Sequence, residues 1–377
     1  MQNNSSIDGD VPNTFDRSNS LPRQLRSLQW LRAIGAMSVV YFHAAIQVRH
    51  LKVGVVAPVI GETGVDIFFV LSGFIMWVTT QNSHVSPRKF FARRIQRIVP
   101  LYWLLTIAVA LCAIAMPHLL RSTRFDALHV LASLSFIPWP NLAAVPGTST
   151  YLSPIIVPGW TLNLEMTFYL LYACCLPLRE GRRVASITIL ITALYVAGLV
   201  GARNHSIASF YGNSIIFEFL MGILLGAYLI PFLRFSKALA WALLAISIVT
   251  LAFIESAAPD LPRALKFGCP AFIAIAAAVN LERRSAVPDL PALVKLGDAS
   301  YSIYLSHIIV LAGLRMAVRF LGIDGSPGTA YVFIAIALLA SAIVGLLIHE
   351  YIEKPLSRIK LGLGGLNNKP RNTTPQH

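Results

Sequence analysis

Long apolar stretches alternate with short polar connections along most of this chain. Ten of these stretches predict membrane-spanning helices, because about 20 apolar residues cross the hydrocarbon core of a bilayer. The predicted spans cover residues 28–48, 64–80, 98–116, 159–177, 184–202, 211–230, 238–255, 267–281, 299–320 and 329–348. The pattern therefore predicts an all-α, polytopic integral membrane helical bundle with about ten transmembrane helices.

One further apolar run, Ala127–Trp139, lies between the third and fourth predicted spans. It is shorter than a span, so we expect a re-entrant or interfacial segment. A true crossing at this point would move the basic stretch 178–183 to the outer side of the membrane.

The two ends of the chain are polar and differ from the rest. Residues 1–24 lack the apolar core of a signal peptide, and we expect a disordered cytoplasmic tail there. Residues 359–377 are expected to form a second disordered cytoplasmic tail. The stretch 25–358 between them is expected to be one membrane domain, which closes with an amphipathic cytoplasmic segment at 349–360.

Composition and charge support a membrane protein. Of the 377 residues, 56% are hydrophobic and 13% are charged, whereas a soluble domain carries about 25% charged residues. The connections on the side of the two termini hold 21 Lys and Arg residues, and the opposite connections hold 7. The richer side is cytoplasmic, so both termini are expected inside. The net charge of +14 is then explained by these loops and needs no nucleic acid partner.

Two polar residues lie within the first predicted span. Arg32 and His43 are eleven residues apart. This spacing is about three turns plus 20°, so they share one helix face, about 16 Å apart along the axis. A charged side chain inside a span costs about 2.5–3.5 kcal/mol on insertion scales and marks a functional site by default. The alternative is that Arg32 snorkels to the surface and that His43 is a hydrogen-bonded packing residue.

Two carboxylates are expected near the outer ends of their spans. Asp66 begins the second span, where a first-turn acid also suits the helix dipole. Glu165 lies about 7 Å below Trp160 along the helix axis. Trp160 itself suits either an interfacial aromatic residue or a residue of a pocket wall. His43, Asp66 and Glu165 are therefore expected at a similar depth in the outer half, as a base with carboxylate orienters.

A cluster of arginines precedes the third predicted span on its cytoplasmic side. Arg93, Arg94 and Arg97 lie on a short amphipathic segment, and Arg94 and Arg97 share a face at i, i+3 spacing. One interpretation is that these arginines are simply positive-inside anchors. Beside Arg32, they also suit a phosphate-bearing ligand that enters from the cytoplasm.

Two later spans carry further polar groups. Glu218 in the sixth span has no obvious partner, and a structural role suits it as well as a functional one. In the ninth span, Tyr304 and His307 share a face and Tyr301 precedes them, which suits a pocket wall or simple packing. The four cysteines lack the spacing of a metal site, so no metal is expected.

Taken together, these motifs resemble the membrane acyltransferase-3 family. Arg32 and His43 match its R-x10-H signature, and Arg94 and Arg97 match its next basic block. Met166 stands where the commoner form of the family has a second acid, and this departure resembles the branch that acylates exopolysaccharide. Over nearly the whole chain, the other blocks match in order: GVDIFFVLSGF, IVPLYW, GWTLNLEMTFY and SYSIYLSH.

The resemblance implies an enzyme of about ten spans that uses cytoplasmic acyl-CoA to O-acylate glycans at or across the membrane. His43 is then the catalytic histidine, with Glu165 or Asp66 fixing its tautomer. It either deprotonates the glycan hydroxyl or carries the acyl group itself. By the same resemblance, Arg32 and the arginines at 93–97 hold the acyl-CoA.

The expected donor is acetyl-CoA or succinyl-CoA, a co-substrate and not a permanently bound cofactor. The expected acceptor is a sugar hydroxyl of a polysaccharide or of its lipid-linked oligosaccharide precursor. The expected location is the bacterial cytoplasmic (inner) membrane, with other polysaccharide-assembly proteins as candidate partners. A transporter of a lipid-linked glycan or of protons is the main alternative, although the chain has no inverted repeat. A noncatalytic scaffold is the third.

Overall fold

The computed structural model describes most of the predicted membrane domain. The described residues are 25–50, 60–81, 83, 85–116, 124–145, 148, 151–203, 207–230, 232–323 and 327–358. The two tails that were expected to be disordered, 1–24 and 359–377, lie outside the described residues.

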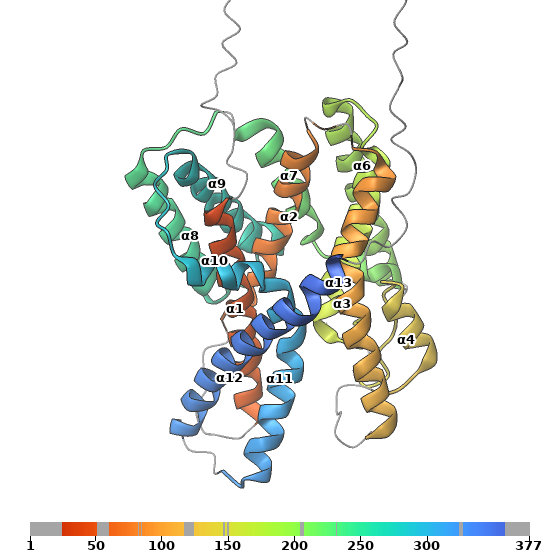
Figure 1. Cartoon of the computed structure of the whole chain (residues 1–377). Helices are drawn as coiled ribbons and strands as arrows, with labels where there is room; N and C mark the ends of the chain where they lie inside the picture. The colour runs from red at the N-terminus through yellow and green to blue at the C-terminus, as the bar shows by residue number, and fades with distance from the viewer. Residues whose placement is uncertain are drawn as a thin grey trace, which may run out of the picture.

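All regular structure within the described residues is helical, as predicted (Figure 1). Short 3₁₀ or π segments extend or precede several helices: η2 (Val157–Gly159), η3 (Ile207–Tyr211), η4 (Leu225–Leu229), η5 (Ala264–Gly268) and η6 (His349–Glu353). The α-helices are α1 (Arg26–His50), α2 (Gly64–Thr80), α3 (Pro87–Ala115), α4 (Ala127–Leu134), α5 (Trp160–Cys175), α6 (Glu180–Arg203), α7 (Ile216–Leu224), α8 (Lys237–Ala257), α9 (Cys269–Arg283), α10 (Pro291–Asp298), α11 (Ser300–Phe320), α12 (Pro327–Ile348) and α13 (Lys354–Arg358).

The helices fit a protein that crosses the membrane many times. Among the described residues, eight helices are long and apolar enough to span a bilayer, and α2 is a shorter apolar helix. Each of the ten predicted spans contains a helix. The chain is therefore a multi-pass helical membrane protein, while the number of crossings and the sides of the termini stay predictions.

Helix α1 lies at the centre of the bundle. It packs against α2, α9, α10, α11 and α12, and α3 packs against α4 and α5 on the other side of the molecule (Figure 1). Buried aromatic and aliphatic side chains of α2, α3, α5, α6 and α7 form the largest core cluster. A second cluster joins α1 and α2 to α8 and α9. The candidate site lies between α1 and α3.

Helices α2 and α7 cross at close range through paired glycines. A Cβ atom on Gly222 of α7 would lie 1.9 Å from the carbonyl oxygen of Val70, and one on Gly73 of α2 would lie 2.0 Å from that of Phe219. Small residues let the backbones of membrane helices approach in this way. The contact fixes α2, which carries several residues of the candidate site.

We expect Gly222→Ala to destabilise the protein, because the added methyl group has to push α2 away. Overpacking of this kind costs about 1–3 kcal/mol or more. Gly181→Ala is the matched control: its Cβ meets nothing within 4 Å, and alanine favours a helix by about 0.5–1 kcal/mol. The melting temperature of detergent-purified protein checks both. Equal melting temperatures for the two variants would contradict the proposed close contact.

The apolar run 127–139 forms only a short helix. Helix α4 has eight residues, so it is about 12 Å long and cannot cross a bilayer. The chain after it turns back into the bundle: the backbone N–H of Ile155 donates to Ser133 Oγ at 3.0 Å, and His129 Nε2 bonds to the carbonyl of Ser153 at 2.9 Å. Ser153 and Ile155 are buried. The run is therefore not a span, as predicted.

This returning chain starts α5 inside the bundle. Gly159, just before α5, packs against the side chain of Tyr102, which lies near the middle of α3. The hydroxyl of Tyr304 on α11 donates to the carbonyl of Pro158 at 3.0 Å. Because α5 begins among buried side chains, its first polar residues lie deeper than a helix that starts at the membrane surface would place them.

Candidate active site

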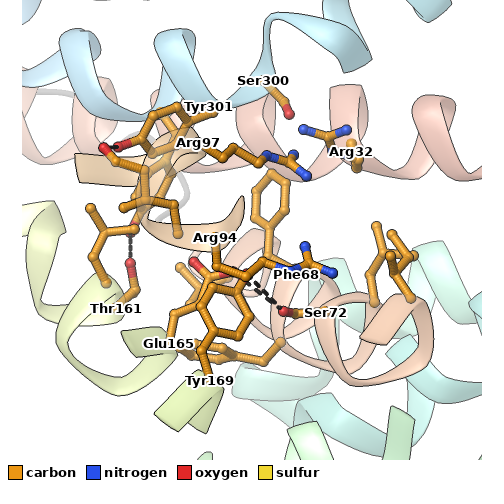
Figure 2. Close-up of a pocket in the computed structure, with 17 residues that line it drawn as sticks. Arg32, Phe68, Ser72, Arg94, Arg97, Thr161, Glu165, Tyr169, Ser300 and Tyr301 are labelled. Carbon is orange, nitrogen blue, oxygen red and sulfur yellow. Dashed lines mark hydrogen bonds between the residues drawn. The ribbon is translucent and has the colours of Figure 1, made fainter. Parts of the chain in front are cut away.

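A pocket between α1, α2, α3, α5 and α11 gathers most of the predicted polar residues (Figure 2). Its space free of protein atoms is about 780 Å³, and this figure includes a part that is open to solvent. The lining residues are Arg32, Val65, Phe68, Phe69, Leu71, Ser72, Ile75, Arg94, Arg97, Ile98, Thr161, Leu162, Glu165, Tyr169, Ser300, Tyr301 and Tyr304.

Three guanidinium groups face this pocket, from two helices that are far apart in sequence. Arg32 on α1 donates to Gln29 Oε1 at 3.1 Å, and Arg94 on α3 lies over the rings of Phe90 and Tyr169. Figure 2 shows the ends of Arg32, Arg94 and Arg97 around the same space. Within the described residues, none of the three forms an ion pair with a carboxylate. The pocket therefore carries surplus positive charge that suits an anionic ligand.

Arg93, which was also predicted to hold the ligand, lies outside the pocket. Its side chain is exposed and is absent from the lining residues. Adjacent residues on a helix point about 100° apart, and here Arg94 faces the pocket while Arg93 points away from it. Only the i, i+3 pair of Arg94 and Arg97 faces the pocket, as their spacing predicted.

Glu165 is the carboxylate of the pocket and is held by two hydroxyl groups. The hydroxyl of Tyr169, one turn later on α5, donates to Glu165 Oε1, and Ser72 Oγ on α2 donates to the same oxygen at 3.3 Å. The two hydroxyl groups are 3.4 Å apart. These contacts fix the carboxylate at the wall opposite α1.

The expected separation of Glu165 from the arginines was wrong. It was placed in the outer half with His43, apart from the arginines, but it lines the same pocket as Arg32, Arg94 and Arg97. The estimate assumed that α5 starts at the membrane surface. The returning chain before α5 starts the helix inside the bundle, so Glu165 faces the arginines.

Asp66 has a different partner from the one expected. Both of its carboxylate oxygens accept from Arg263, from Nε and Nη2, each at 2.9 Å, and Arg263 also donates to Glu62. Asp66 is fully buried and does not line the pocket. Its carboxylate therefore forms an ion pair that joins α2 to Arg263, the residue just before η5. Glu218, which had no obvious partner, is fully buried on α7 next to η5.

His43 lies next to a second histidine. Its ring centre is 5.1 Å from that of His307 on α11 and 5.1 Å from that of Phe42. Within the described residues no ion pair joins His43 to Asp66 or Glu165, and these carboxylates accept instead from Arg263 and from Ser72 and Tyr169. The expectation that one of these carboxylates contacts His43 is therefore corrected. His307 was predicted as a pocket residue, but it is fully buried behind Tyr304.

Two aromatic rings separate His43 and His307 from the pocket lined by Arg32, Arg94 and Arg97, which we call the arginine pocket. Phe68 and Tyr304 line the pocket, and their ring centres are 6.0 Å apart. The Phe68 ring lies against Gly35 of α1, at 3.4 Å from a Cβ built there. Gly35 comes one turn after Arg32 and about 12 Å before His43 along the axis. We call Phe68 and Tyr304 the aromatic partition.

Of the other residues predicted to form the pocket wall, some line the pocket and one does not. Tyr301 lines the pocket, and its hydroxyl donates to the carbonyl of Ile98 at 2.7 Å. Tyr304 also shares a hydrogen bond of 2.9 Å with Thr161. Trp160 is not a lining residue: it packs behind the wall against Phe69, with ring centres 6.4 Å apart.

Several pocket residues were not predicted. Tyr169 lies four residues after Glu165, so helical spacing could have placed both on one face. Outside the pocket, the Asp66 partner Arg263 was not predicted either: it is a basic residue near the start of a span on the side that is poor in basic residues, and that exception could have marked it. Ser72, Phe68 and Ser300 give no such indication, because serine and phenylalanine are ordinary residues of a membrane helix.

Comparisons with known proteins agree with this architecture. The family model described as an acyltransferase domain matches residues 25–349. The exopolysaccharide production protein ExoZ of Rhizobium meliloti is 35% identical over 332 residues, which cover 86% of this chain and 98% of that protein. No solved structure matches the chain.

Two more distant relatives carry enzyme names. The acyltransferase MdmB of Streptomyces mycarofaciens is 28% identical over 90% of this chain and 93% of its own. The peptidoglycan O-acetyltransferase OatA of Listeria monocytogenes is 26% identical over 56% of this chain and 35% of its own. The family model covers most of the chain and all the helices that form the pocket. The chain therefore belongs to this family of membrane acyltransferases.

Proposed function

We propose that the protein transfers an acyl group from cytoplasmic acyl-CoA to a sugar hydroxyl of an extracellular or cell-surface polysaccharide, or of its lipid-linked precursor. The acyl group is acetyl or succinyl, and the location is the bacterial cytoplasmic membrane. The observation that carries the proposal is the arrangement on α1, where an arginine pocket and a histidine lie on either side of the aromatic partition.

The pocket supports a donor with phosphate groups. Arg32, Arg94 and Arg97 offer forked donors that match phosphate oxygens, and among the residues that line the pocket Glu165 is the one carboxylate. The first turn of α11 also reaches the pocket, since Ser300 and Tyr301 line it. The N-terminus of a helix favours anions. Ser300 Oγ is buried without a hydrogen-bond partner in the described residues, so a ligand atom can bind it.

The distance along α1 supports an extended donor. Arg32 and His43 are about 16 Å apart along the axis, which a compact anion cannot bridge. Acyl-CoA carries its phosphates at one end and its thioester at the other, joined by the long pantetheine arm. With the phosphates at the arginines, the arm passes the aromatic partition and brings the thioester toward His43.

The acceptor is inferred from the relatives and from the chemistry of His43. One relative is named for exopolysaccharide production and another for O-acetylation of peptidoglycan, so a glycan hydroxyl is the proposed acceptor. In the reaction, the carbonyl–sulfur bond of the thioester breaks and a carbonyl–oxygen ester bond forms. The hydroxyl proton passes through His43 to the sulfur of CoA.

Two routes give this balance. In the first, His43 removes the hydroxyl proton while the oxygen attacks the thioester directly. In the second, His43 takes the acyl group and then passes it to the hydroxyl. The test of the whole proposal is transfer of radiolabelled acyl groups from acyl-CoA to glycan in vesicles that contain the purified protein. Glycan or proton movement without label transfer would support a transporter instead.

Topology gives an independent check. We expect reporter fusions at Asn204 and Ser326 to report the outer side, and fusions at Gly181 and Asn367 to report the cytoplasm. The reason is the 21-to-7 asymmetry of basic residues between the two sides. Paired alkaline phosphatase and fluorescent-protein fusions measure it. An outer location of Gly181 would contradict the interpretation of 127–139 as a segment that does not cross.

A further inference from the structure

We propose that His307 is a positioning residue that fixes the tautomer of His43. The proposal rests on the proposed function, because it assumes that His43 acts as the base or the acyl carrier. Neither carboxylate expected in this role is placed to perform it. Asp66 is paired with Arg263, and Glu165 accepts from Ser72 and Tyr169.

The hydrogen bond of His307 places its proton. His307 Nδ1 lies 2.6 Å from the backbone carbonyl oxygen of Tyr304. A carbonyl oxygen only accepts, so Nδ1 carries the proton. In the neutral ring, the lone pair is then on Nε2. The side chain is fully buried, and its Nε2 has no hydrogen-bond partner among the described residues.

His43 is placed to satisfy that nitrogen. An imidazole nitrogen lies about 1.1 Å from the centre of its ring, so an N–H···N bond of about 2.9 Å puts two ring centres about 5 Å apart. The rings of His43 and His307 are 5.1 Å apart with a tilt of 37°. A buried acceptor without a partner is unfavourable, and a small rotation of His43 directs an N–H to it.

A hydrogen bond from His43 to His307 determines which nitrogen of His43 can act as the base. If one nitrogen of His43 donates to His307, the other nitrogen carries the lone pair that accepts a proton or an acyl group. Burial separates the two roles, because His43 is partly exposed and His307 is not exposed at all. His43 can therefore touch substrate, and His307 acts through it. A neutral partner also avoids a second charge in the membrane.

Two variants of His307 separate this role from a structural one. Glutamine places a carbonyl oxygen near the position of Nε2, so His307→Gln keeps an acceptor for His43. Asparagine places its amide near Nδ1, so His307→Asn keeps the bond to the Tyr304 carbonyl and leaves His43 without a partner. A residue that only anchors α11 through Tyr304 should tolerate asparagine better.

We expect His307→Gln to keep kcat within about tenfold of the wild type and His307→Asn to lower it about 100-fold or more, since a misoriented base loses most of its effect. The KM for acyl-CoA should change less than about twofold in both variants. Equal activities, or the reverse order, would overturn the proposal. Inactive His43→Gln with fully active His307→Asn would overturn this inference alone, whereas active His43→Gln would overturn the proposed function as well.

A measurement on the wild-type protein covers the case in which a His307 variant does not accumulate. Protein with ¹⁵N-labelled histidine in lipid nanodiscs gives nitrogen shifts that report the tautomer of each ring, and His43→Gln assigns the His43 signals. We expect a single neutral tautomer for His43. Signals split between both tautomers would overturn the proposal.

Discussion

Replacing His43 by glutamine is expected to abolish acyl transfer while the protein inserts and accumulates normally. Glutamine keeps a polar group and much of the volume, but it takes up no proton near neutral pH and cannot carry an acyl group. Loss of a general base costs about 10²–10⁴-fold in rate. Incorporation of labelled acyl groups into polysaccharide, normalised to the amount of membrane protein, measures the effect.

The surroundings of His43 make this substitution informative. Its ring lies against those of Phe42 and His307, and the neighbouring α1 residues Ala44 and Ala45 are fully buried. A packing histidine at this position would tolerate glutamine, since the arginine pocket lies beyond the aromatic partition and stays intact. Near-normal transfer by His43→Gln would remove the catalytic assignment and leave the pocket as a binding site for an anion only.

The second large effect is expected at the arginine pocket. Arg97→Ala should raise the KM for acyl-CoA about 10- to 150-fold, because one charge-assisted hydrogen bond is worth about 1.5–3 kcal/mol. Arg94→Ala should have a similar effect and also lose its contact with the Tyr169 ring. The change should nearly vanish with acyl-pantetheine, which has the thioester and the arm without the distal phosphates of CoA. Vesicle transfer assays with the two donors measure it.

Arg93→Ala is the matched control for this prediction. Arg93 lies on the same helix with the same charge, but its side chain is exposed outside the pocket. A topological anchor depends on the number of positive charges, so all three alanine variants would then mislocalise to a similar degree. A donor KM that changes equally for Arg93→Ala and Arg97→Ala would contradict phosphate binding in the pocket.

Local sequence patterns predicted the helices and part of the pocket. Each predicted apolar stretch contains a helix, because the apolar pattern is a local signal. Which residues share one face of a helix depends only on helical geometry. The same geometry placed Arg94 and Arg97 on one face, whereas Arg93, which was also predicted to hold the ligand, lies outside the pocket. The short helix at Ala127–Leu134 followed from length alone.

The sequence did not predict the contacts that depend on how distant segments meet. Glu165 joins the arginines because the chain between α4 and α5 returns into the bundle, and no local pattern marks that return. Asp66 pairs with Arg263, and His43 meets His307, across separations that helical periodicity does not address. Depth estimates from span ends fail wherever a helix starts inside the protein.

The aromatic partition has a consequence for the electrical insulation of the cell. In the proposed topology the arginines are open to one aqueous phase and the histidines lie nearer the other, so water that joined them would form a leak for ions. One charge that crosses a potential of 100 mV releases about 2.3 kcal/mol, so such a leak would drain the gradient steadily. The rings of Phe68 and Tyr304 lie between the two regions, and an apolar constriction of this kind excludes hydrated ions. In the proposed function the same two rings also admit a slender thioester arm, so a substitution that widens the passage would ease entry of the donor and weaken the barrier to ions.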